Sequence, residues 1–134
     1  MNKRLLMIFF AIGMLVLASI ACDASASTAN ISSVVLTAEN SATGAETTTF
    51  TPDQTFYAVV TLANAPDTTK VKAVWSTVDG DGKATQMAEK EIVGSASPII
   101  FNAANNAGPW PVGNYRVEIF LNDKSNKVID FSVQ

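Results

Sequence analysis

The side chains that could do chemistry in this 134-residue chain are few, and one common type is missing. The sequence contains no histidine, which removes the commonest general base, the commonest metal ligand and every histidine-based catalytic triad. The G-x-S-x-G and S-x-x-K nucleophile patterns and a glycine-rich phosphate loop are also missing from it. We therefore predict no catalytic residue, no metal site and no cofactor.

The acidic cluster Asp79–Lys83 (DGDGK) invites a calcium interpretation. An EF-hand type of calcium loop needs an oxygen ligand at its fifth position, glycine at its sixth and glutamate at its twelfth. Counted from Asp79, those positions hold Lys83, Ala84 and Lys90, and none of them fits. Asp-Gly steps supply the positive φ angles of tight hairpins, so this cluster predicts a turn between two strands.

Glu89 and Glu91 form the second acidic candidate. Two residues apart in a strand, their side chains share one face about 7 Å apart. Paired carboxylates hydrolyse glycosides, but that chemistry needs a cleft and perturbed pKa values. Polar neighbours on a weak strand pattern favour a solvated face instead.

Trp110 and Phe120 are the candidate contact residues for a partner. Trp110 lies between Pro109 and Pro111, and an aromatic side chain on a stiff loop is a good binding anchor. The alternative is that Trp110 folds over the open end of the core, where burial stabilises a large apolar side chain by about 1.5–3 kcal/mol. Phe120 and Val74 fall on outward strand faces, where they form an apolar patch or pack against a loop.

The N-terminus has the pattern of an export signal. Lys3 and Arg4 precede an apolar run over 5–20, which ends in small residues and the sole cysteine, Cys22. A charged start, an apolar stretch and small residues at its end are the three parts of a secretory signal. The run is long for such a signal and short for a spanning helix of about 20 residues.

The residues Ala18–Cys22 (ASIAC) resemble the lipobox of bacterial lipoproteins, although Ser19 stands where that family usually has an aliphatic residue. The resemblance implies cleavage before Cys22 and attachment of a lipid, such as a palmitoyl chain, to that cysteine. Asp23 resembles a signal for retention in the inner membrane. Two alternatives stay open: cleavage after Ala26 to give a soluble product, and retention of the segment as an uncleaved anchor with its basic end in the cytoplasm.

Three segments follow from this pattern: a lipoprotein-type signal peptide over 1–21, a flexible polar tether over 22–30 and one domain over 31–134. The chain carries 9 basic and 12 acidic residues, and loss of Lys3 and Arg4 changes its net charge from −3 to −5. An acidic surface repels phosphate backbones, so we expect no nucleic-acid partner.

The domain reads as short strands separated by turns, with no helical period. The alternation of side chains between two faces is clearest in three stretches, Phe56–Leu62, Val71–Trp75 and Tyr115–Leu121. About seven antiparallel strands at regular spacing predict an all-β sandwich, preceded by an N-terminal signal or anchor helix. The expected strands cover 31–38, 54–63, 69–78, 84–93, 97–103, 115–121 and 128–133, with a short extended piece before Phe50.

Two places resemble immunoglobulin-like and fibronectin-like domains. Trp75 lies in the third strand, where that fold often has its core tryptophan, and Gly113–Tyr115 resembles the tyrosine corner at the start of the penultimate strand. The antibody-type cysteine pair is missing, so the resemblance is to the cysteine-free bacterial domains of this shape. It implies that Trp75 and Tyr115 are structural core residues of an immunoglobulin-like β-sandwich.

Together these features predict a lipid-anchored domain on the extracytoplasmic side of a cell membrane. We expect a binding or accessory module without catalysis, which docks to a protein or a cell-envelope component. The alternatives are a small envelope enzyme or enzyme inhibitor with its site near Trp110, and an adhesion or surface structural domain.

Overall fold

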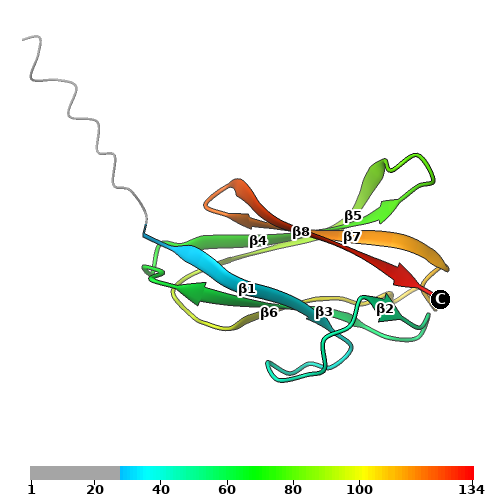
Figure 1. The fold of residues 1–134 in the computed structure, drawn as a ribbon, viewed down its shortest axis with the longest axis horizontal. Coiled ribbons are helices and arrows are strands. Elements are labelled where there is room, and N and C mark those ends of the chain that lie inside the picture. The colour runs from blue at the N-terminus through cyan, green and yellow to red at the C-terminus, as the bar shows by residue number, and fades with distance from the viewer. Residues whose placement is uncertain (1–27) are drawn as a thin grey trace, which may run out of the picture.

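The computed structural model describes residues 28–134, which form eight strands in two packed sheets (Figure 1). The expected signal or anchor helix, Cys22 and most of the expected tether lie outside the described residues. A three-stranded sheet has the order β1-β3-β6, and a five-stranded sheet has the order β2-β8-β7-β4-β5. The strands are β1 Asn30–Thr37, β2 Thr49–Phe50, β3 Phe56–Ala63, β4 Lys70–Val78, β5 Ala84–Val93, β6 Ile99–Ala103, β7 Gly113–Leu121 and β8 Lys124–Val133.

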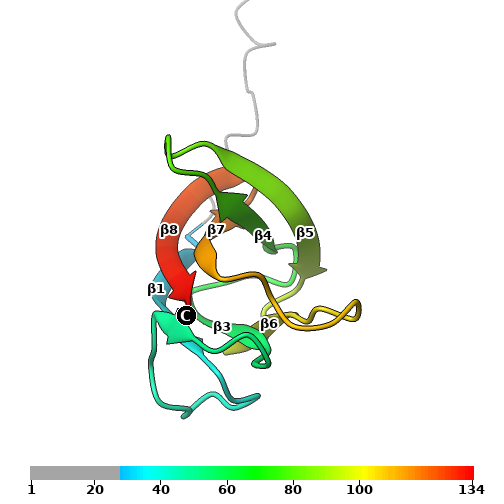
Figure 2. The ribbon, with the colours of Figure 1, turned by 90° about the vertical axis from the view of Figure 1, so that its right-hand side faces the viewer.

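The core lies between the sheets and follows the alternation of the strands. In β4 the inner-face residues Val71, Ala73 and Trp75 are buried, and Tyr115, Val117, Ile119 and Leu121 are buried in β7. Seen end-on in Figure 2, the five-stranded sheet curls over the smaller one. We call the faces that meet in the core inner and the opposite faces outer. The expected all-β fold of two packed sheets is therefore confirmed.

The strands differ from the expectation in two details. The short extended piece expected before Phe50 is β2, but it pairs in parallel with β8, through Thr49↔Ser132 and Phe50↔Val133, where only antiparallel strands were expected. Between the expected strands 115–121 and 128–133 the chain makes a two-residue turn, Asn122–Asp123, in which both residues adopt positive φ angles of 48° and 68°. β8 therefore begins at Lys124, four residues earlier than its apolar part indicates.

The Asp79–Gly82 segment forms the predicted turn between β4 and β5. The Asp79 carbonyl accepts a hydrogen bond from the Gly82 N–H at 3.0 Å, and Gly82 has a φ of 81°. The Asp79 carboxylate accepts two more, from the N–H of Asp81 at 3.0 Å and of Lys83 at 2.8 Å. The carbonyl oxygen and one carboxylate oxygen of Asp79 therefore stabilise the turn. In the described part of the chain, no helix has the length and apolar character needed to cross a membrane.

Candidate functional site

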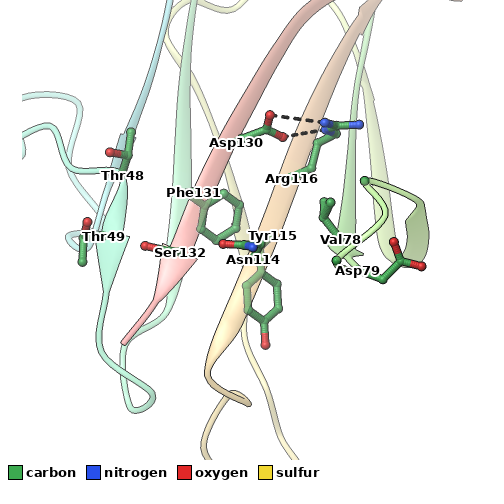
Figure 3. Close-up of a pocket in the computed structure, with 12 residues that line it drawn as sticks. Thr48, Thr49, Val78, Asp79, Asn114, Tyr115, Arg116, Asp130, Phe131 and Ser132 are labelled. Carbon is green, nitrogen blue, oxygen red and sulfur yellow. Dashed lines mark hydrogen bonds and ion pairs between the residues drawn. The ribbon is translucent and has the colours of Figure 1, made fainter.

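A groove of about 550 Å³ lies on the outer face of the five-stranded sheet (Figure 3). It is at the end where β4 turns into β5, where β7 begins and where β8 ends. Its volume is within the range of about 300–1,000 Å³ that is common for small-ligand sites. The groove is lined by Thr48, Thr49, Val78, Asp79, Gly80, Gly82, Asn114, Tyr115, Arg116, Asp130, Phe131 and Ser132.

The floor of the groove is polar because strand alternation sends polar side chains outward there. Tyr115 and Phe131 point into the core and are 2% and 4% exposed, so their neighbours along each strand face out. The register pairs Asn114 with Ser132 and Arg116 with Asp130. Thr49 pairs with Ser132 from the other side, which extends the polar row to the edge of the sheet.

Arg116 and Asp130 form a bidentate ion pair across this floor (Figure 3). Arg116 Nε donates to Asp130 Oδ1 at 2.6 Å, and Nη2 donates to Oδ2 at 3.2 Å. The hydrogen bonds from Arg116 lower the pKa of the Asp130 carboxyl, and Asp130 in turn raises the pKa of Arg116. Both groups are charged at neutral pH, and their charges cancel within the groove.

Two segments flank the groove on this outer face of the sheet. The Asp79–Gly82 turn stands on one side, and Thr48 and Thr49 stand on the other (Figure 3). Asp79 uses one carboxylate oxygen within its own turn. Among residues 28–134, no group of three or more acidic, cysteine or histidine side chains is placed to hold a metal ion.

Trp110 lies at the same end of the molecule as the groove but does not line it. It is partly buried against the core and stacks on Phe56, with ring centroids 4.6 Å apart and planes at 21°. Its indole Nε1–H donates to the Gln54 carbonyl at 3.0 Å, and its backbone N–H donates to the Pro52 carbonyl at 2.8 Å. Trp110 therefore covers this end of the core, and its exposed edge lines a recess with Gln54 and Asn105.

Phe120 lies on the outer face of the same sheet, near the opposite end of β7 from the groove. It is paired with Lys72 of β4, whose Nζ lies 4.7 Å from the Phe120 ring centroid. Val74 is two residues further along β4 and is half-buried. The structure thus separates the two candidate contact residues, Trp110 and Phe120, and brings neither into the groove.

Trp75 and Tyr115 both lie in the core, with exposures of 1% and 2%. The Tyr115 hydroxyl donates to the Pro111 carbonyl at 2.6 Å, and burial raises the pKa of this phenol. Trp75 packs against Phe56 and Phe131, with ring centroids 6.2 and 6.0 Å away. Its Nε1 is buried and has no hydrogen-bond partner in the described domain.

Glu89 and Glu91 lie on the outer face of β5, opposite Val74 and Lys72 of β4. Both side chains are exposed, and neither lines the groove. The groove residues Asn114, Arg116 and Asp130 were not singled out from the sequence. Their signal is visible only after β7 and β8 are paired, because each residue alone is an ordinary outward polar position.

These observations define an all-β protein of two packed sheets with a polar groove on one outer face. No protein-family model and no curated protein matches the sequence.

Among solved structures, the alkylpurine DNA glycosylase AlkC of Pseudomonas fluorescens, bound to DNA containing an abasic site analogue, matches 79% of this chain. The identity is 14% and the TM-score is 0.49, and the chain spans 30% of the length of that protein. At these values the similarity bears on neither function nor partner.

Proposed function

We propose that the protein is a lipid-anchored binding module on the extracytoplasmic side of a cell membrane, which docks to a protein or cell-envelope component without catalysis. The observation that carries the proposal is the position of the groove. β1 begins at one end of the sandwich, and β8 ends at the other (Figure 1). The groove is lined by residues at this second end, including Asp130 and Ser132 of β8. A chain held by lipid on Cys22 therefore presents the groove away from the membrane surface.

The length of the strands, which separates the start of β1 from the groove, supports this arrangement. Strands of eight to ten residues extend about 26–33 Å at a rise of about 3.3 Å per residue. A tether that joins the domain at Asn30 thus leaves the groove at the far end of the longest dimension. In this arrangement, the polar side chains of the groove face the extracytoplasmic space, where a partner can reach them.

The immunoglobulin-like assignment belongs to the same proposal. In that fold, the strand with the core tryptophan neighbours the strand of the tyrosine corner. Here β4, with Trp75, pairs with β7, with Tyr115. The hydrogen bond from the Tyr115 hydroxyl to a carbonyl four residues upstream has the form of a tyrosine corner.

A non-catalytic role is supported by composition and by placement. The chain has no histidine, and the two glutamates that could have formed a hydrolytic pair are exposed on an outer strand face, away from the groove. On the groove floor, Arg116 and Asp130 are paired with one another, and the neighbouring Asn114 presents an exposed amide. Such a site is suited to holding a partner.

Site-specific photo-crosslinking tests the proposal. A photoreactive amino acid at Asn114, in the groove, should capture a partner in the membranes of cells that make the full chain. The same amino acid at Asn102 is the matched control, since Asn102 is also an exposed strand asparagine but lies on the three-stranded sheet. Equal capture from both positions, or none from Asn114, would contradict a binding role for the groove.

A further inference from the structure

The groove floor mixes hydrogen-bond donors and acceptors and has no surplus positive charge. Arg116 has five N–H donors and uses two of them on Asp130. The Asp130 oxygens each keep lone pairs for a further bond. Asn114 and Thr49 supply an amide and a hydroxyl, and within residues 28–134 neither side chain has a hydrogen-bond partner.

This pattern matches a ligand that carries many hydroxyl groups. A sugar hydroxyl donates one hydrogen bond and accepts others, and so it needs donors and acceptors side by side. The groove provides them within one row, from Thr49 through Ser132 to Asn114, with the Arg116–Asp130 pair in the next row. We propose that the groove binds a neutral saccharide of one to a few sugar units, an inference that rests on the proposed function as a binding module.

Charge argues against an anionic ligand. Recognition of phosphate or carboxylate usually relies on an arginine or lysine whose charge is available, but the guanidinium of Arg116 is already paired with Asp130. Asp79, on the wall, adds negative charge. A phosphate or an acidic glycan would therefore meet net repulsion.

Sheet pairing argues against an extended peptide. A peptide strand binds a sheet by hydrogen bonding to an open edge, but β7 pairs with β4 and β8 on its two sides, and the end of β8 pairs with β2 through Ser132 and Val133. The backbone groups of β7 and of the paired end of β8 are therefore occupied, and recognition over this part of the floor depends on side chains. No exposed aromatic ring lines the groove for stacking, since Tyr115 and Phe131 face the core. We expect weak binding, with Kd of the order of 1 mM, or about −4 kcal/mol.

The test uses the full chain in phosphocholine micelles and follows the Asn114 side-chain NH₂ and the Arg116 Nε–H by NMR. The probes are chitotetraose, cellotetraose and mannotetraose, with inorganic phosphate and calcium chloride as charged comparators. At least one tetrasaccharide should give saturable shifts at both groups. Asn114→Ala should weaken that binding at least tenfold, whereas Asn102→Ala should leave it unchanged.

Several outcomes would overturn the inference. They are the absence of shifts with all three tetrasaccharides, equal binding by the Asn114→Ala and Asn102→Ala variants, and shifts with phosphate or calcium alone. The result is separable from the proposed function. If Asn114 crosslinks to a protein while no saccharide shifts the groove signals, the saccharide inference fails and the binding role stands.

Discussion

At the scale of single residues, Trp75 shows most directly how the fold is stabilised. Its ring packs against both Phe56 and Phe131 in the core, and the side chain is 1% exposed. The alternation around it was enough to predict this burial, because an apolar face on a central strand has to meet the opposite sheet. Its unpaired Nε1 was not predictable, since that depends on which atoms surround it.

We expect Trp75→Ala to reduce the free energy of unfolding by about 3–5 kcal/mol. Trp75→Phe should cost clearly less, because it keeps an aromatic ring and removes a buried N–H that makes no hydrogen bond. Urea denaturation of both variants measures the difference, with Phe120→Ala as a control on the outer face. A loss below about 1 kcal/mol for Trp75→Ala would be inconsistent with a role in the core.

The Arg116–Asp130 pair shows why the site was harder to predict than the core. The sequence places both residues on outward positions, but their meeting depends on the register between β7 and β8. The two-residue turn at Asn122–Asp123 alone would align Arg116 with Ile129. A bulge between the Phe120↔Ser125 and Ile119↔Lys127 pairs shifts the register by one residue and brings Asp130 opposite Arg116.

At the scale of elements, that bulge decides which face of β8 is buried. A shift of one residue in register exchanges the inner and outer faces of a strand. Without the bulge, the aromatic ring of Tyr115 would lie across from Asp130 instead of Phe131. Hydrophobic alternation locates strands within the sequence, but a bulge leaves no comparable pattern. The fold class was therefore predictable, and the composition of the groove was not.

β5 is an open edge of the five-stranded sheet, and its charges protect that edge. Lys90 pairs with Ala73 on the inner face, beside Ile92, while Glu89 and Glu91 occupy the outer face. Charged side chains on both faces, one of them pointing inward, discourage pairing with a second copy. This arrangement explains why a weakly patterned strand carries three consecutive charges.

We expect Lys90→Val to promote self-association through β5, because it leaves an apolar inner face beside an unpaired backbone edge. Size-exclusion chromatography with light scattering should show larger species than the parent chain shows at equal concentration. Lys83→Val, in the turn before β5, is the control and should behave like the parent. If Lys90→Val and Lys83→Val elute alike, the charge at position 90 does not protect the edge.

At the scale of the whole molecule, the proposal depends on how the domain is held. The three possibilities for the N-terminal segment predict different proteins: one attached by lipid at Cys22, one cut after Ala26 and released, and one retained by its own apolar run over 5–20. Only the first and third keep the groove near a membrane. The first alone requires the cysteine.

We expect Cys22→Ser to abolish incorporation of a labelled fatty acid and to move the domain out of the membrane fraction. Fractionation followed by mass determination checks both effects, and Ser19→Ala, which leaves the cysteine in place, is the control. A Cys22→Ser chain that stays membrane-bound at the uncleaved mass shows that the apolar segment is the anchor. Release of the parent chain itself at the mass cut after Ala26 would show a soluble product.

The position of the groove, at the end of the sandwich opposite the start of β1, would also have a mechanical consequence for a domain tethered as proposed. If a bound partner moves relative to the membrane, the pulling force runs from Asn30 to the groove, along the strands. The hydrogen bonds of antiparallel pairs lie perpendicular to that direction, so many of them share the load at the same time. Ser132, on the groove floor, belongs to β8, which is held between β2 and β7. In the proposed arrangement, a pull on Asn30 would load the β1–β3 ladder in shear, because β1 pairs with β3 and belongs to a different sheet from the strands of the groove.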